Sequence, residues 1–230
     1  MIRRILLQGI VGSTAYGLAR EGSDVDRLGV FVAPTVHVAG LDWHPDDETR
    51  VETKPDTTHH EIGKYLRLAL KCNPTITELL WLTPDLYEYV DPYAGRRLIN
   101  MHRAFLSERA VRDAYGGYAR QQAHKLRERC DGSFSSDTRK RTTKHARHLL
   151  RLLRQGRELL ETAALTIKVS DPEDYFAFDN MDTDQMLQVY EREDELFMTA
   201  KSILPEKPDR AAIRDYLVSV RRRFLEAHDV

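Results

Sequence analysis

The sequence predicts an α/β (α+β) domain built on a short mixed sheet, followed by an all-α helical domain. Short β-rich runs alternate with turn signals over the first ~95 residues. After Pro92 the pattern is almost wholly helical. This change of period places a strand-containing domain at residues 1–93 and a helical domain at 94–230.

Three segments of the first part are typical of strands. They lie at residues 5–7, at 25–32, and at 50–58, where Pro55 indicates an edge strand or an interruption. A helical period begins after Glu61, with one apolar face formed by Ile62, Tyr65, Leu66, Ala69 and Leu70. In the second part, breaks at Gly and Pro residues separate five predicted helices, near 94–106, 107–129, 138–163, 182–203 and 208–227.

Composition and length are those of an ordinary globular protein of 230 residues. No apolar run approaches the roughly 20 residues of a membrane span, so no membrane partner is expected. The basic and apolar N-terminus is interrupted at Gln8 and Gly9, which favours a strand over a signal peptide. Cys72 and Cys130 fit no metal spacing and are expected to be buried thiols of a cytoplasmic protein.

The net charge of -1 conceals a strong segregation of charge along the chain. Residues 1–95 carry 9 basic and 14 acidic side chains, a balance of -5. Residues 96–157 carry 17 and 5, which gives +12, and residues 158–230 carry 9 and 17, which gives -8. The first half of the helical domain is therefore predicted to meet phosphate.

One stretch of the sequence indicates phosphate and metal chemistry. Gly12 permits a tight turn after a strand, and Ser13 follows at a helix start, where its hydroxyl and backbone N–H groups can hold phosphate oxygens. Asp24 and Asp26 are two residues apart on an expected strand, so both carboxylates share a face. Such a pair is typical of a Mg²⁺ (or Mn²⁺) site, and two ions roughly 4 Å apart would clamp a phosphoryl displacement.

The order Gly-Ser-x-Ala-Tyr-Gly at 12–17, then Ser-Asp-x-Asp at 23–26, resembles the DNA polymerase beta superfamily of nucleotidyltransferases. More narrowly, it resembles the RNA-ligase-associated, RNA repair pathway family of polymerase-beta-like proteins. A block from Lys64 to Asn73-Pro74, followed by Glu78 and Trp81, supports this resemblance, and a weaker likeness begins at Lys144. The resemblance covers roughly residues 5–160.

The resemblance implies a minimal nucleotidyltransferase domain and a set of site residues. Asp24 and Asp26 would bind two metal ions, with nucleotide contacts from Gly12, Ser13, Tyr16 and Ser23. It also implies a third carboxylate, for which two candidates exist. Asp56 lies within the expected third strand, whereas Glu61 begins the following helix, where an acid also complements the helix dipole. Asp56 is preferred.

The predicted helix at 138–163 carries a basic face opposite an apolar face, which includes Ala146, Leu149, Leu150, Leu153 and Leu160. The basic face consists of Lys140, Lys144, Arg147, Arg151 and Arg154, and no acid occurs between Thr138 and Arg157. A solvated basic face is one interpretation, and contact with phosphate is the other. Lys144 and Arg151 are the individual residues predicted to contact the triphosphate or a nucleic acid.

Other polar clusters have simpler interpretations. His59 and His60 are adjacent, so they point to opposite sides of a strand and are not expected to bind one metal. Lys64 and Glu78 have two interpretations, a structural ion pair between two helices and a catalytic role. Arg221, with the two arginines after it, is interpreted as part of a solvated helix end.

These features predict transfer of a nucleoside monophosphate from a nucleoside triphosphate (NTP, for example ATP) to a hydroxyl, with release of pyrophosphate. The resemblance implies an RNA 3′ end as the acceptor, in RNA repair or tRNA end processing. Three alternatives remain: a degenerate module that binds nucleotide or RNA without turnover, transfer to a small molecule or protein side chain, and nucleotide hydrolysis.

Overall fold

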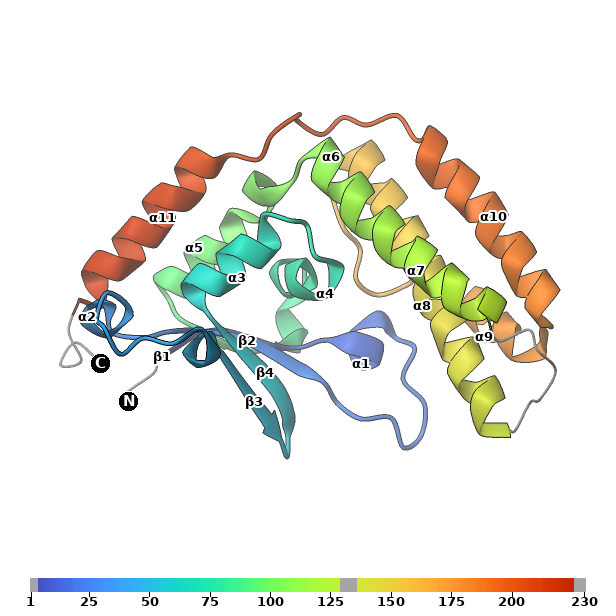
Figure 1. Ribbon diagram of the computed structural model, residues 1–230, viewed down its shortest axis with the longest axis horizontal. Helices are drawn as coiled ribbons and strands as arrows, with labels where there is room; N and C mark the ends of the chain where they lie inside the picture. The colour runs from blue at the N-terminus through green and yellow to red at the C-terminus, as the bar shows by residue number, and fades with distance from the viewer. Residues whose placement is uncertain (1–3, 129–135, 226–230) are drawn as a thin grey trace. The chain divides into compact units, whose positions relative to one another are not determined.

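The computed structural model describes residues 4–128 and 136–225 and divides the chain into two compact units. The first unit is formed by two segments of the chain, one up to Leu106 and one from Pro208 onward. The second unit is Ser107–Lys207. The boundary expected at residue 93 thus falls inside the first unit, and the last helix belongs with the sheet (Figure 1).

The first unit is built on a five-stranded sheet in the order β3-β4-β2-β1-β5. The strands are β1 (Arg4–Ile10), β2 (Arg27–Val32), β3 (Thr49–Thr53), β4 (Asp56–Glu61) and β5 (Tyr87–Val90). β2 and β4 are parallel, and the other three pairs are antiparallel. The short mixed sheet predicted from the sequence is therefore confirmed.

Two strands differ from the sequence-based expectation. The single strand expected at 50–58 is an antiparallel hairpin, in which Thr53 pairs with Asp56 and Pro55 occupies the turn. Pro55 interrupts the strand because its nitrogen has no hydrogen to donate to a neighbouring strand. β5 was not predicted, because four residues before Pro92 are too few to display a strand period.

Helices cover this sheet. They are α1 (Gly12–Tyr16), α2 (Thr35–Val38), α3 (Ile62–Ala69), α4 (Pro74–Thr77), α5 (Ala94–Asn100) and α11 (Arg210–Arg223). α3 packs on β2 and β4 through a buried face that includes Ile62, Tyr65, Leu66 and Ala69, as its period predicts. The Tyr65 hydroxyl donates to the carbonyl of Ile76 at 3.0 Å, which links α3 to α4.

The C-terminal helix α11 is fixed to the first unit by specific contacts. The Tyr216 hydroxyl donates to the carbonyl of Ala94 at 3.0 Å, and the backbone N–H of Thr35 donates to the carbonyl of Phe224 at 2.9 Å. Tyr216 and Phe224 are buried. The apolar face of α11 is thus part of the core of the first unit, although more than 100 residues separate it from α5 in the sequence.

The second unit is a helical bundle. Its elements are α6 (Glu108–Val111), a π-helical turn (Arg112–Gly116), α7 (Gly117–Glu128), α8 (Ser136–Thr162), α9 (Pro172–Phe176) and α10 (Thr183–Thr199). Leu149, Leu153 and Leu160 of α8 are buried, so the predicted apolar face is confirmed. Within the described residues, no helix is long and apolar enough to span a bilayer. Cys72 is a buried free thiol, and Cys130 lies outside the described residues.

Candidate nucleotidyl transfer site

The Gly-Ser turn and the Asp-x-Asp pair meet at one edge of the sheet. β1 ends at Ile10, and α1 begins two residues later at Gly12. Between them, the backbone N–H of Val11 donates to the carbonyl of Asp26 at 2.9 Å. This bond extends the antiparallel pairing of β1 and β2 by one step and brings two motifs that are distant in sequence side by side.

The backbone conformation at position 12 and the side chain next to it both require glycine. Its φ of 69° lies in the left-handed region, which a side chain disfavours. A Cβ at this position would lie 2.4 Å from the Oδ2 atom of Asp26, closer than real Cβ contacts allow. Glycine is therefore required at position 12 for two independent reasons. The Asp26 carboxylate lies directly against the start of α1.

The two aspartates, expected on a strand, lie before β2, which begins one residue after Asp26 and three residues after Asp24. Asp24 is exposed and Asp26 is partly exposed. Before them, Ser23 closes a turn: its Oγ accepts from the N–H of Arg20 at 2.9 Å, and its own N–H donates to the carbonyl of Arg20 at 2.9 Å. The pair thus sits on a short segment between this turn and the first strand pair of β2.

Tyr16, expected to contact the nucleotide, is buried, and its hydroxyl donates to the carboxylate of Glu78. This hydrogen bond anchors α1 to the segment after α4. Ser13, one turn earlier, keeps a partly exposed side chain. The structure shows other partners for Lys64 and Glu78 than each other: the Lys64 ammonium donates to Thr49 Oγ1 at 2.6 Å, and the Glu78 carboxylate accepts from Tyr16.

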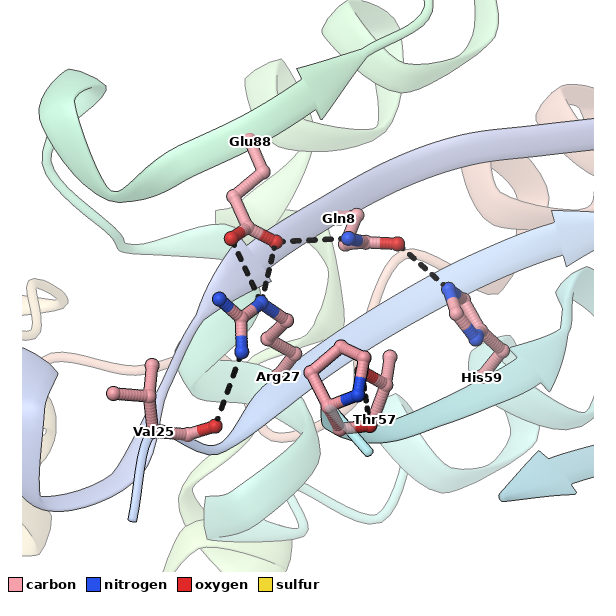
Figure 2. A network of polar contacts seen from close by, with 7 residues as sticks. Gln8, Val25, Arg27, Thr57, His59 and Glu88 are labelled. Atoms are coloured by element: carbon pink, nitrogen blue, oxygen red, sulfur yellow. Dashed lines mark hydrogen bonds and ion pairs between the residues drawn. The ribbon is translucent and has the colours of Figure 1, made fainter. Parts of the chain in front are cut away.

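Arg27, which follows Asp26, links the aspartate segment to the edge strand β5 (Figure 2). Its Nε donates to Glu88 of β5 at 2.8 Å, and its Nη1 donates to the carbonyl of Val25 at 3.3 Å. Val25 is the residue between the two aspartates. Arg27 and Glu88 were not predicted, since a partner 61 positions away leaves no local signal.

The same network fixes the protonation of His59. The Glu88 carboxylate only accepts, so the Gln8 amide directs its nitrogen to it at 2.8 Å and its oxygen to His59 Nε2 at 2.7 Å. His59 Nε2 must therefore carry the hydrogen (Figure 2). Burial lowers the pKa of His59, in agreement with a neutral ring. His60 contacts Thr49 instead, so the two histidines have different surroundings.

The two candidates for the third carboxylate lie at opposite ends of β4. In the parallel register, Arg27 pairs with Thr57, so Asp56 precedes the first pair just as Asp26 does. Glu61 pairs with Phe31 at the other end of the strand. It is five positions from Asp56, which corresponds to roughly 16 Å at the usual rise of a strand. Asp56 is exposed at the edge that carries the aspartate pair.

Glu61 has a structural task instead. It is 2% exposed, and its carboxylate accepts from the N–H of Gly63 at 2.7 Å, which caps the start of α3. Both of its oxygens also lie within 2.8 Å of the Arg221 guanidinium. Arg221, expected on a solvated helix end, is thus part of a buried ion pair.

The aspartate pair has the chemistry that a hard divalent cation prefers. Carboxylate oxygens are the usual ligands of Mg²⁺, and Gly12 keeps the Asp26 carboxylate next to a helix start suited to phosphate. Asp24 and Asp26 therefore fit the metal that the motif implies. Across residues 4–128 and 136–225, no three His, Cys, Asp or Glu side chains converge as a complete ligand set.

The basic face of α8 is largely paired within the second unit. Arg147 contacts Asp179, and Arg154 contacts Asp174 at 2.8 Å and Glu193 at 3.1 Å. The acids come from segments after α8, so part of the positive charge of 96–157 is matched by the negative charge of 158–230. An uninterrupted phosphate-binding stripe, one of the two interpretations of this helix, does not fit these contacts.

Lys144 and Arg151 differ from each other. Arg151 is 2% exposed and bonds Gln155 at 2.6 Å and His148 at 3.1 Å, so it is a core residue of the second unit. It has no exposed surface for a triphosphate, contrary to the expectation. Lys144 is exposed on α8. Its role in phosphate binding stays a prediction.

The family comparison covers most of the chain. The model of the RNA repair pathway DNA polymerase beta family (RlaP) matches residues 2–195. The match includes the Gly-Ser turn, both aspartates and most of the helical unit, and it ends before α11. No curated protein matches the chain.

Proposed function

Because the chain belongs to this family, which indicates nucleotidyltransferase activity, we propose that it transfers a nucleoside monophosphate to the 3′-hydroxyl of an RNA. The donor is an NTP, and pyrophosphate is the second product. In this reaction the acceptor oxygen bonds to the α-phosphorus while the bond from that phosphorus to the bridging oxygen breaks. The RNA acceptor is proposed from the family's association with RNA repair.

One observation carries the proposal. The Asp26 carboxylate lies against the α-carbon of Gly12, at the start of a helix that follows a strand. A phosphate held by this helix start would lie beside the carboxylate pair, which is the arrangement that metal-assisted phosphoryl transfer requires. Separately, each motif has an ordinary structural explanation.

Each residue then has a proposed task. Asp24 and Asp26 hold Mg²⁺, which supplies neutralisation of the charge that develops on the phosphates. Ser13 and the first N–H groups of α1 bind the terminal phosphates of the NTP. Asp56, at the same edge of the sheet, accepts the proton of the attacking hydroxyl. Tyr16 holds α1 in position through Glu78.

Incubation with α-³²P-labelled NTPs, total RNA and Mg²⁺ or Mn²⁺ tests the proposal. Label is expected on RNA, together with released pyrophosphate, and both are lost in the Asp24→Ala, Asp26→Ala double variant. Asp42→Ala is the matched control, because Asp42 is an exposed aspartate of the same unit away from both motifs. Absence of label and of pyrophosphate with every NTP would reject the proposal.

A second candidate is a module that binds nucleotide without turnover. It is favoured by the absence, among the described residues, of a converged three-carboxylate set. Such a module would protect the first unit against thermal unfolding when NTP and Mg²⁺ are added, yet release no pyrophosphate. Label on a protein, on a small molecule or on nucleoside monophosphate alone would instead identify a different acceptor.

A further inference from the structure

The surface formed by α5 and α11 gathers arginines on the first unit. Arg96 and Arg97 lie on α5, and Arg222 and Arg223 lie at the end of α11. All four are exposed. The two helices are joined directly, since the Tyr216 hydroxyl of α11 donates to the carbonyl of Ala94. We refer to these four residues as the arginine surface.

Within the described residues, no acid forms an ion pair with the arginine surface. The acids that precede these arginines most closely in sequence are engaged elsewhere. Asp91 is buried, contacts Arg4 at 3.2 Å and caps α5 through the N–H of Ala94 at 2.7 Å. Asp215 of α11 contacts Arg214 at 3.3 Å. As far as residues 4–128 and 136–225 go, the four positive charges are therefore left for a partner of opposite charge.

Two of these arginines are held in place by the protein. Arg97 donates to Ser219 Oγ at 2.9 Å and lies over the ring of Tyr216, 5.6 Å from its centroid. Arg223 lies over the ring of Tyr93 at 4.7 Å, and Tyr93 is 41% exposed. Guanidinium groups that are fixed before binding lose less side-chain entropy when they contact phosphate.

We propose that the arginine surface binds the phosphate backbone of the RNA acceptor, an inference that rests on the proposed function for the identity of the partner. Planar guanidinium groups match the geometry and the charge of phosphate oxygens. α11, which carries two of the four arginines, lies beyond the residues matched by the family, whereas α5 lies within them.

The position of the surface indicates which part of the RNA it meets. Arg4, at the start of β1, contacts the end of α11, with its guanidinium over the ring of Phe224 at 5.4 Å. The Gly12 turn follows the other end of β1, roughly 20 Å away at the usual rise of a strand. An RNA whose 3′ end is at Asp26 would therefore meet the surface roughly 20 Å from that end and not at its last nucleotide.

Binding of a fluorescent RNA hairpin with a 3′ overhang, followed by anisotropy at several salt concentrations, tests this inference without turnover. The test variant carries Arg→Gln at all four positions of the arginine surface. The control variant carries Arg→Gln at Arg50, Arg67, Arg109 and Arg214, exposed arginines that pair with acids, so the net charge change is equal. A third variant replaces the arginine surface with lysine.

The test variant is expected to bind more weakly, with a salt dependence of log K that is less steep by about 3, as loss of three to four phosphate contacts predicts. The control keeps the wild-type slope, and the lysine variant restores most of it. Equal losses in test and control variants, or loss in the lysine variant despite a wild-type melting temperature, would overturn the inference. Since no NTP is present, failure of the transfer assay does not affect this result.

Discussion

Replacement of Gly12 by alanine should separate the geometry of the site from the stability of the fold. The added methyl group perturbs two features at once. It places a side chain in the left-handed region, at a cost of about 1–2 kcal/mol. It also meets the Asp26 carboxylate, whose Oδ2 lies 2.4 Å from the new Cβ.

The size of the second effect follows from the structure. Real Cβ contacts essentially never fall below 3.0 Å, and ordinary contacts begin at 3.4 Å, so the Asp26 carboxylate must retreat by about 0.6–1.0 Å. A misplacement of about 1 Å in a catalytic group costs on the order of 100-fold in rate. We therefore expect kcat/KM for nucleotidyl transfer to fall by roughly 100-fold in Gly12→Ala.

Gly22→Ala is the matched control, because Gly22 has a φ of 79° and no heavy atom lies within 4 Å of the place that an alanine Cβ would occupy. Both variants should lose a similar free energy of unfolding in urea, whereas only Gly12→Ala should lose the labelled RNA product. Equal activity of the two variants would contradict this expectation. It would mean that the carboxylate at Gly12 is not part of the reacting centre.

Three further predictions concern the surroundings of the site. Glu61→Gln or Arg221→Met alone should lower the free energy of unfolding by about 3–5 kcal/mol in urea titration. The double variant should lose less than the sum of the two single losses, and additive losses would contradict a coupled buried pair. In the folded protein the pKa of His60 is lowered from its usual value of 6.5 to about 4, by burial first and then by nearby positive groups. Between these two pH values the unfolded chain therefore binds a proton at His60 that the folded chain does not bind. Stability should hence fall as pH decreases from about 6.5 to 4, and the slope should flatten in His60→Asn; an unchanged slope would show that another group titrates. Arg27→Met should lower kcat about tenfold, because the Arg27–Glu88 pair positions the aspartate segment. The KM for NTP and the free energy of unfolding should change little. A raised KM alone would argue for direct contact between Arg27 and the nucleotide.

The fold class was accessible from the sequence because it depends on local periodicity. The apolar faces of α3 and α8 repeat every three to four residues, and burial selects such faces wherever a helix meets a core. The β3–β4 hairpin was less accessible. Pro55 marked an interruption, but only the pairing of Thr53 with Asp56 shows that the chain reverses there.

The aspartate pair shows how far a motif can lead. Its residue types and spacing predicted metal and phosphate chemistry, and the family match covers it. The contact between Asp26 and Gly12 depends on the pairing of β1 with β2. That pairing joins segments on either side of a long connection, so no local pattern contains it.

The sequence by itself determined the α/β and helical halves, the Gly-Ser turn and the two aspartates, since each is encoded by residues close together in the chain. The tertiary structure shows where the two candidates for the third carboxylate lie. The parallel register of β2 and β4 puts Asp56 at the aspartate edge, whereas Glu61 is buried against Arg221, 160 residues away. It also showed that Arg151 is buried and that Arg154 is paired, because the acids that neutralise charge on α8 approach only when the bundle folds. Charge counted along a chain does not reveal which charges remain exposed, since folding places opposite charges together.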